Sequence, residues 1–474
     1  MNKQAFNPYL PSWEYIPDGE PYVFDGRVYI YGSHDRFNGH AYCLNDYVTW
    51  SAPVDDLSDW RYEGVIYEKT QDPFNTDGSM CLYAPDMTQG PDGRYYLYYV
   101  LDHKSVVSVA VCDSPAGKFQ FYGYVHYPDG TLLGEKEGDE PQFDPGVLTE
   151  RDRTYLYTGF CFAGDKSRHG PMCTVLGPDM LTIEEAPVFI APSQPYSQGS
   201  GFEGHEFFEA PSIRKNGDTY YFIYSSVVFH ELCYATSKSP TEGFQYGGVI
   251  ISNNDLGIDS YKPGNKPMYY GGNNHGSMVQ IGEKWYIFYH RQTNGTSFSR
   301  QAMAQELTIQ PDGSIPQVEM TSCGLNGGPL DGRGTYPAHI ACNLFCDTES
   351  TYTGGIAGNL FWVDPHCPRI TQDGRDGDEE PGYIMNMMNS ATAGFKYFNF
   401  QGVTKVTIRV RGYCNGVFQV KTAWDGPVLG EIPVRFTNVW QDYTAEIALP
   451  DGVHPLYFTY SGPGSGALLS FTLE

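Results

Sequence analysis

Five ionisable side chains recur at one position of a repeated sequence pattern. Each lies ten or eleven residues before an aromatic residue that anchors a strand-like run; they are Asp18, Asp86, Asp144, Glu209 and His275. Carboxyl groups brought close together cannot all ionise, so some of them would have raised pKa values. A carboxylic acid close to an ionised carboxylate can work as a general acid–base pair. The spacing therefore predicts a shared acid–base site.

The aromatic runs define the repeat that would bring these side chains together. Each run follows a turn, and they read DGRVYIYGS from Asp25, DGRYYLYYV from Asp92, RDRTYLYTG from Arg151, NGDTYYFIYSS from Asn216 and IGEKWYIFYH from Ile281. Successive anchors are 67, 59, 65 and 65 residues apart; they are Tyr29, Tyr96, Tyr155, Tyr220 and Trp285. Each unit holds about four strand-like runs and no sustained helical period. This pattern predicts a five-bladed β-propeller, whose innermost strands converge on the axis.

The segments around the five ionisable residues resemble glycoside hydrolase family 43 over roughly residues 7 to 320. The matching motifs are D-G-E-P-Y-V-F from Asp18, Y-A-P-D from Tyr83, F-D-P-G-V from Phe143, F-E-A-P-S from Phe208 and N-H-G-S from Asn274. The resemblance implies a five-bladed propeller with Asp18 as general base, Asp144 as pKa modulator and Glu209 as general acid. Gly19 replaces the usual proline after the base, and Glu20-Pro21 offers a second acidic-proline pair, so Glu20 stays an alternative base.

Blade positions support these roles. Blades one and four of a five-bladed ring are not neighbours, so Asp18 and Glu209 should face each other with room for a sugar and a water. That arrangement inverts the anomeric configuration. Asp144, on the blade next to Glu209, should place a like charge nearby and keep Glu209 protonated as the acid.

Four other residues are candidates for binding. Arg300, in F-S-R-Q, matches the family arginine that contacts sugar hydroxyls and the modulator, although a salt bridge at the rim is the alternative. Tyr83 and Asp86 are expected to bind substrate, with Tyr83 in place of the usual Trp. The resemblance implies that His275 is a ligand or near neighbour of one Ca²⁺ ion, or of water, at the axis. A buried histidine without a metal is the alternative. No organic cofactor is expected.

The repeat ends after Pro311-Asp312-Gly313, and three regions are expected. Residues 1–322 form the catalytic propeller, residues 323–335 a Gly-rich linker, and residues 336–474 a β-sandwich similar to carbohydrate-binding module family 6. Trp424, Trp440 and Tyr443 in the sandwich could stack on sugars or belong to its core. The fold class is thus all-β, a propeller followed by a sandwich resembling a jelly roll.

Composition restricts the partners and the compartment. The net charge of −26 repels phosphate backbones, so nucleic acid is not an expected partner. No apolar run approaches the roughly 20 residues of a membrane span. The 11 cysteines suggest neither a zinc site nor a disulfide framework, and together with an N-terminus that lacks a signal-like apolar stretch they favour the cytoplasm. The sequence indicates no oligomeric state.

These features predict an inverting, exo-acting glycoside hydrolase that takes plant-type oligosaccharides, most simply an α-L-arabinofuranosidase or a β-xylosidase. Endo-arabinanase or exo-β-galactosidase activity and a non-catalytic carbohydrate-binding propeller are the alternatives. A retaining fructan hydrolase would need N-D-P-N-G, R-D-P and E-C motifs, where this chain has P-D-G-E-P, F-D-P and E-A.

Overall fold

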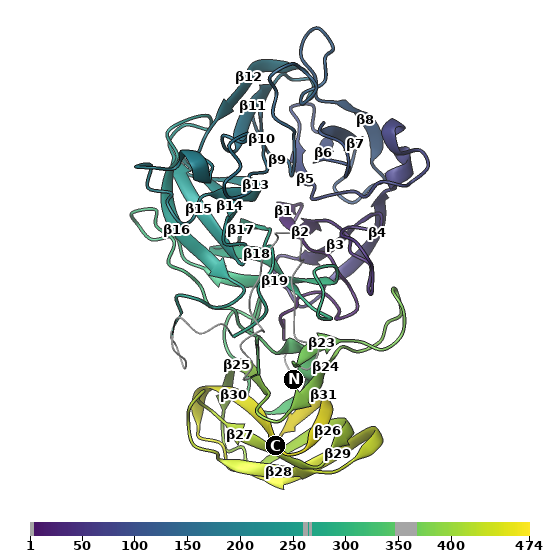
Figure 1. The fold of residues 1–474 in the computed structure, drawn as a ribbon, viewed down its shortest axis with the longest axis vertical. Coiled ribbons are helices and arrows are strands. Elements are labelled where there is room, and N and C mark those ends of the chain that lie inside the picture. The colour runs from purple at the N-terminus through teal and green to yellow at the C-terminus, as the bar shows by residue number, and fades with distance from the viewer. Residues whose placement is uncertain (1–3, 259–263, 265–267, 347–366) are drawn as a thin grey trace.

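The computed structural model describes residues 4–258, 264, 268–346 and 367–474. Five small antiparallel sheets surround an axis and a two-sheet sandwich lies against one side of the ring (Figure 1). The described residues contain no α-helix and no helix long and apolar enough to cross a membrane. The prediction of an all-β propeller followed by a sandwich is confirmed.

The propeller blades follow one another along the chain, and each blade runs outward from the axis in sequence order. Blades one to four have four strands, and blade five has three strands among the residues described. The strands are β1 (Glu20–Phe24), β2 (Arg27–Tyr31), β3 (Tyr47–Pro53), β4 (Arg61–Tyr67), β5 (Asp86–Gln89), β6 (Tyr95–Tyr99), β7 (Ser108–Cys112), β8 (Gln120–Tyr124), β9 (Gly146–Glu150), β10 (Arg153–Thr158), β11 (Met172–Leu176), β12 (Ile183–Phe189), β13 (Phe207–Asn216), β14 (Thr219–Ser226), β15 (Glu231–Ser237), β16 (Gln245–Ser252), β17 (Ser277–Ile281), β18 (Lys284–Gln292) and β19 (Arg300–Leu307). Three short 3₁₀ turns also lie in this region: η1 (Lys69–Gln71), η2 (Pro73–Asn75) and η3 (Gln194–Tyr196).

The repeated aromatic runs form the second strand of every blade. Their rings fill the spaces between adjacent blades, as where Tyr157 of blade three meets Phe222 of blade four at 6.1 Å. Alternating residues of a strand point to opposite faces, so a run rich in tyrosine can pack against both neighbouring blades. The aromatic runs therefore recur in the sequence because each blade needs one to pack against its neighbours.

An N-terminal segment closes the ring along the edge of blade five. Asn7 pairs through its side chain with Ala304 of β19, donating to the carbonyl at 2.7 Å and accepting from the N–H at 2.9 Å. Further along, Gln301 donates to the carbonyl of Ser12 at 2.7 Å. The segment covers an edge strand that would otherwise leave backbone groups unpaired.

Two sheets of six strands form the sandwich. One has the order β20-β25-β30-β27-β28, with β22 on β25, and the other has the order β23-β24-β31-β26-β29, with β21 on β31. The elements are β20 (Leu330–Asp331), β21 (Gly334–Pro337), η4 (Ala338–Ile340), β22 (Asn343–Phe345), β23 (Arg369–Thr371), β24 (Tyr383–Met388), β25 (Thr392–Phe400), β26 (Lys405–Cys414), β27 (Gly416–Lys421), β28 (Gly430–Val434), β29 (Thr437–Glu446), β30 (Gly452–Ser461) and β31 (Gly464–Leu473). Residues 323–335, expected to be a linker, already contain β20 and the start of β21, because their backbone pairs with β25 and β31.

Trp424 and Trp440 both contact aromatic neighbours inside the sandwich. Trp424 packs edge-on against Phe345 at 4.9 Å and Tyr457 at 5.9 Å, and Trp440 packs against Tyr383 at 5.4 Å. These ring contacts support a packing role for both tryptophans within the sandwich.

Buried charges join the sandwich to the propeller. Arg291 of β18 is fully buried and donates to the carbonyls of Ala341 and His339, each at 2.6 Å. From the sandwich side, Nζ of Lys396 in β25 forms ion pairs with Glu319 at 2.6 Å and with Asp255 at 3.4 Å. One hydrophobic cluster also runs through both parts, so the two domains share a core.

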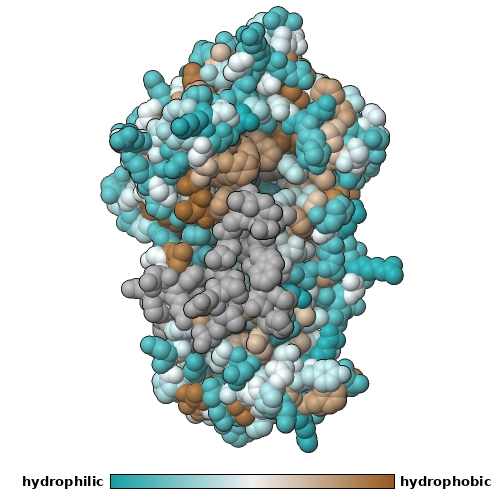
Figure 2. Space-filling model, viewed as in Figure 1, coloured by the Kyte–Doolittle hydropathy of each residue, from teal (hydrophilic) through white to brown (hydrophobic). Residues whose placement is uncertain are grey.

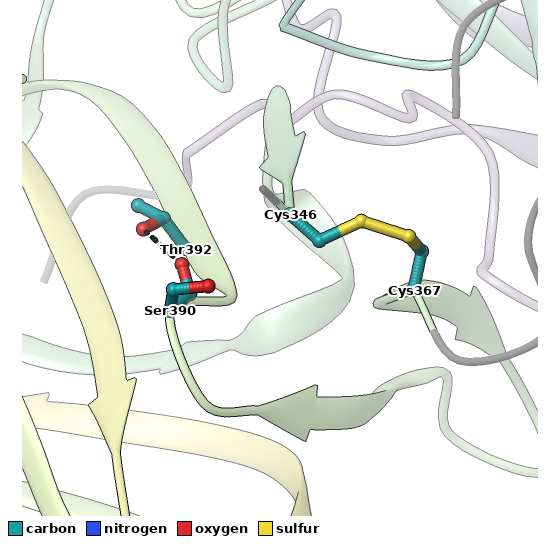
Figure 3. The surroundings of a disulfide bond; sticks show 4 residues. All are labelled: Cys346, Cys367, Ser390 and Thr392. Atoms are coloured by element: carbon teal, nitrogen blue, oxygen red, sulfur yellow. Dashed lines mark hydrogen bonds between the residues drawn. A yellow bond between two sulfur atoms is a disulfide. The ribbon is translucent and has the colours of Figure 1, made fainter. Parts of the chain in front are cut away.

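A disulfide bond joins Cys346 and Cys367 in the sandwich (Figure 3). The expectation that the cysteines form no disulfide was wrong for this pair. Their spacing of 21 residues gave no local signal, because β22 and β23, which precede and follow the two cysteines, belong to different sheets and only the tertiary fold brings the cysteines together. The other nine cysteines are free thiols.

Candidate active site

The first strands of the blades bring the predicted carboxyl groups to the axis. Asp18 and Asp144 lie two residues before β1 and β9, and both have left-handed backbone, with φ of 59° and 43°. Glu209 lies within β13, where the strand pairing shifts register and Ala210 has φ of 64°. Such conformations are uncommon outside glycine, and they turn these side chains away from the regular strand direction.

A cavity of about 270 Å³ opens at this place. Its lining consists of Asp18, Tyr42, Cys43, Tyr83, Ala84, Phe143, Asp144, Phe160, Phe208, Glu209, Asn273, His275 and Arg300. Hydrophobic residues gather around the centre of the propeller in Figure 2, which has the same orientation as Figure 1. Six of the seven residues predicted for the site line this cavity, and Asp86 is the exception.

Asp18 is ionised by its neighbours. Burial opposes its charge, but Arg300 donates to Oδ1 at 2.9 Å and Nδ1 of His290 lies 3.2 Å from the same oxygen. These contacts hold the pKa of Asp18 well below its usual range. Arg300 is itself fixed by Asp35, whose two carboxylate oxygens each accept from its guanidinium at 2.9 Å.

Glu209 has the opposite electrostatic environment. Burial, with the charge of Asp18 as a second cause, raises the pKa of Glu209 to about 8. Its Oε1 accepts a long hydrogen bond from Nδ2 of Asn273, at 3.4 Å. Glu209 therefore keeps its proton near neutral pH while Asp18 is charged, which is the division of protonation that acid–base hydrolysis requires.

Asp144 lies beside Glu209, as expected for neighbouring blades. Its Oδ2 accepts from the backbone N–H of Ala210 at 3.2 Å. Burial and the nearby Glu209 and Asp18 raise the pKa of Asp144 well above its usual range. A charged Asp144 was expected to raise the pKa of Glu209. The structure instead gives burial and Asp18 as the causes.

Glu20, the alternative base, does not line the cavity. Its side chain is buried beneath the site, where Oε2 accepts from Arg214 at 2.6 Å and from the hydroxyl of Ser212 at 3.0 Å. The structure thus directs Asp18 into the cavity and Glu20 into contacts between blades one and four.

Asp86 likewise makes contacts that hold the fold together. Oδ1 accepts from the hydroxyl of Tyr22 and the N–H of Met87, and Oδ2 accepts from the N–H of Val147, each at 2.7 Å. The side chain is fully buried and ties blade two to blades one and three. Its capacity for hydrogen bonds is used by the protein, so the structure places it outside the sugar-facing surface.

His275 lies among the acidic groups at the axis. Nδ1 is 3.7 Å from Asp144 and 3.9 Å from Asp18, while Nε2 is 4.0 Å from Oε1 of Glu20. Burial lowers the pKa of His275 to about 4, so the imidazole is neutral and can bind a metal ion.

A second group of side chains that could bind a metal ion lies in blade four, and two of its members are hydrogen-bonded to each other. His205, Glu231 and Cys233 place ligand atoms within 4.8 Å of one another, but Glu231 already accepts from His205 at 2.6 Å.

Several lining residues were missed from the sequence. Three phenylalanines form a continuous wall, with Phe160 packed on Phe143 at 4.9 Å and on Phe208 at 5.2 Å. Two of the three directly precede predicted acids, Asp144 and Glu209, and that adjacency was a usable signal.

Tyr42 and Cys43 were also missed, because they lie on a loop with no periodic pattern. Asp35 reaches the site indirectly, through Arg300.

Comparison with known proteins decides the family. Residues 17–315 match the family described as Glycosyl hydrolases family 43. The chain belongs to this family. It is therefore a glycoside hydrolase, and the resemblance found in its motifs is confirmed.

Two similar proteins match this chain over different shares of its length. A xylosidase/arabinosidase from Thermoclostridium stercorarium is 74% identical over 473 residues, which cover 100% of this chain and 99% of the relative. A xylosidase/arabinosidase from Bacteroides ovatus is 28% identical and covers 66% of this chain and 97% of its own.

Solved structures agree with the fold. A family 43 arabinoxylan arabinofuranohydrolase from Bacillus subtilis, in complex with cellotetraose, covers 100% of this chain and 98% of its own, with a TM-score of 0.54 and 20% identity. A β-xylosidase/α-arabinofuranosidase from a compost microbial metagenome covers 65% and 96%, with a TM-score of 0.52 and 27% identity. The latter structure is described as a complex with xylotriose in a calcium-free form.

Proposed function

We propose that the chain is an inverting, exo-acting glycosidase that releases terminal pentose units, as a β-xylosidase, an α-L-arabinofuranosidase or both. One observation carries the proposal: an ionised Asp18 and a protonated Glu209 line the same small cavity of a family 43 propeller. The cavity volume of about 270 Å³ is at the lower end of ligand sites, which suits one sugar unit better than a polymer.

The proposed reaction is a single displacement by water. Asp18 removes a proton from a water molecule as that water attacks the anomeric carbon. Glu209 donates its proton to the glycosidic oxygen as the bond to the leaving sugar breaks. Asp144 places a second carboxyl beside Glu209. Arg300 orients Asp18 through Nη1, and the second N–H of the same nitrogen is left for a sugar hydroxyl. The product has the opposite anomeric configuration to the substrate.

The substrate class comes from the relatives and from the walls of the cavity. The names of two relatives combine xylosidase and arabinosidase, and one of them is 74% identical across the chain. Tyr83 and the phenylalanine wall offer apolar faces for the sugar ring. An oligosaccharide with a terminal xylose or arabinose is the proposed partner, and the intact acid and base disfavour a purely carbohydrate-binding role.

A calcium ion at the axis would be bound by His275 and Glu20. Nε2 of His275 and Oε1 of Glu20 are 4.0 Å apart, and that carboxylate oxygen has no hydrogen-bond partner among the described residues. Calcium takes six to eight ligands, mostly oxygens, so water would supply the remaining ones. The ion would add positive charge beside the carboxyl groups. Calcium content after dialysis, with and without a chelator, tests the site, and His275→Ala should abolish any bound calcium.

A panel of para-nitrophenyl glycosides tests the proposed function. Cleavage of the β-D-xyloside or the α-L-arabinofuranoside, with NMR detection of the inverted anomer as the first product, supports the proposal. Retention of configuration contradicts the mechanism. Release of internal fragments from arabinan without cleavage of the small glycosides favours the endo-acting alternative.

A further inference from the structure

The sandwich reaches the propeller through the connection between β23 and β24, residues 372–382 (Figure 1). Asp376 in this connection accepts hydrogen bonds from two residues of blade one. Its Oδ1 accepts from the backbone N–H of Phe37 at 2.7 Å, and its Oδ2 accepts from Nδ2 of Asn45 at 3.1 Å. A carboxylate that binds two donors of one loop fixes the separation between them.

These two donors lie near the two ends of a loop that lines the cavity. Residues 36–45, between β2 and β3, contain Tyr42 and Cys43 of the cavity lining. Asn45 closes the base of this loop, because its Nδ2 also donates to the carbonyl of Asp35 and its backbone N–H donates to the carbonyl of His34, each at 3.0 Å. Asp376 therefore acts where the loop begins and ends.

The same loop is linked to the arginine beside Asp18. Oδ1 of Asp35 accepts from the backbone N–H of Cys43 at 3.0 Å and from Arg300 at 2.9 Å. Arg300 also lies 4.8 Å from the centre of the Tyr42 ring and donates to Asp18. The conformation of loop 36–45 thus determines the wall next to Asp18.

A second contact from the sandwich supports the same loop. Gln372 accepts a hydrogen bond from the hydroxyl of Tyr15 at 2.7 Å. Tyr15 is buried and stacks on Phe37 at 5.6 Å, and its carbonyl accepts from the N–H of Asp35 at 3.0 Å. Two residues of one sandwich connection therefore hold the start of the loop.

We propose that Asp376 of the C-terminal sandwich is a positioning residue for the active site of the propeller. It lies outside the cavity lining and acts through Phe37 and Asn45, which keep Tyr42 and Cys43 against the bound sugar. The sandwich thereby completes the sugar-binding wall. This inference rests on the proposed function, since the bound sugar is the one that the proposed reaction releases.

Kinetics of Asp376→Ala on the preferred para-nitrophenyl glycoside test the inference. KM should rise about five- to tenfold with kcat within about twofold, because the loop lines the sugar site and carries neither the proposed acid nor the proposed base. Asp376→Asn, which keeps an oxygen for Phe37, should restore part of the loss. The matched control is Asp373→Asn in the same connection, whose carboxylate accepts from Arg411 and Tyr383 within the sandwich. Its KM should equal that of the wild type.

Hydrogen exchange of the peptide that covers residues 36–45 gives a readout independent of catalysis. Exchange should become faster in Asp376→Ala and stay unchanged in Asp373→Asn. Unchanged exchange, an unchanged KM in Asp376→Ala, or an equal rise of KM in both variants would overturn the inference. If the wild type cleaves no glycoside, the proposed function fails. The exchange data, with the Kd of xylose or arabinose in place of KM, then still decide the role of Asp376.

Discussion

Arg300 donates from Nη1 to Oδ1 of Asp18 at 2.9 Å, and both side chains are almost completely buried. The opposite edge of the guanidinium is fixed by Asp35, so the arginine cannot turn away without losing two further hydrogen bonds. A buried guanidinium between two carboxylates favours the charged form of each. This relationship keeps the proposed base ionised in a cavity whose other two acidic groups are held protonated.

Arg300→Met should move the acidic limb of the pH profile of kcat/KM upward. The base works when it is ionised, and the pKa of Asp18 lies well below the usual value in the wild type, so acid should inactivate the enzyme only at very low pH. Without the guanidinium, burial raises this pKa, and activity should decline below about pH 5, with kcat/KM lower by about 10²-fold or more. The exposed Arg61→Met is the control. An acidic limb at the same pH in Arg300→Met would contradict this account.

Glu209 should set the alkaline limb. The acid works when it is protonated, and its pKa is raised to about 8, so kcat/KM should stay level through neutral pH and decline above about pH 8. Glu209→Gln should lose about 10²–10⁴-fold on substrates with poor leaving groups and much less on 2,4-dinitrophenyl glycosides, which need no proton. Its profile on the activated substrate should lack the alkaline limb. An alkaline limb that persists there would assign the acid to another group.

Asp18→Asn and Glu20→Gln should separate catalysis from structure. Asp18→Asn should lower kcat by about 10²–10⁴-fold, because it removes the proposed base. It should also lower the melting temperature, because Asp18 pairs with the buried Arg300, so the two variants are distinguished by kcat. Glu20→Gln should lower the melting temperature by several degrees and affect kcat less, because Glu20 pairs with the buried Arg214. The reverse pattern of kcat values would make Glu20 the base.

Lys396→Met should loosen the sandwich from the propeller. The substitution removes the buried cation that contacts Asp255 and Glu319, and loss of one member of a buried ion pair costs about 3–5 kcal/mol. The melting temperature measured by calorimetry should decline by about 5–10 °C. Lys238→Met, which removes an exposed pair with Asp218, should change it by less than about 2 °C. Equal effects of the two substitutions would show that the buried network does not stabilise the domain contact.

Reduction should destabilise the sandwich through Cys346 and Cys367. A disulfide that closes a loop of about 20 residues is worth about 2–4 kcal/mol, so dithiothreitol should lower the melting temperature of the wild type by several degrees. The double variant Cys346→Ser, Cys367→Ser should melt at the lower temperature with or without reductant. A linked peptide in a non-reducing digest would establish the bond. Its absence from protein isolated from cells would agree with the predicted cytoplasmic location, which stays a prediction.

Local sequence patterns were sufficient for the architecture of the propeller. The aromatic runs recur because each blade must pack against two neighbours, and the ionisable residues recur because each innermost strand begins at the axis. Periodicity of this kind is a local property of the chain. Asp18, Asp144 and Glu209 could therefore be predicted as a group before any contact between them was known.

The choice between Asp18 and Glu20 required the tertiary structure. Residues two apart on a strand face the same side, so alternation alone would treat the two alike. The left-handed backbone at Asp18 and the salt bridge of Glu20 with Arg214, 194 residues away, separate them. The same holds for Asp86, whose register position matches the catalytic candidates but whose oxygens are used by three donors of the protein.

The sequence by itself thus determined the fold class, the family and the set of residue types at the axis, because all three are expressed in repeats and short motifs. Only the tertiary structure decided which side chains pair. Arg300 finds Asp35 at a separation of 265 residues, and Asp376 finds Asn45 at 331. Such contacts depend on closure of the ring and docking of the sandwich, and no spacing along the chain encodes the distance between two loops that meet only when both domains have folded.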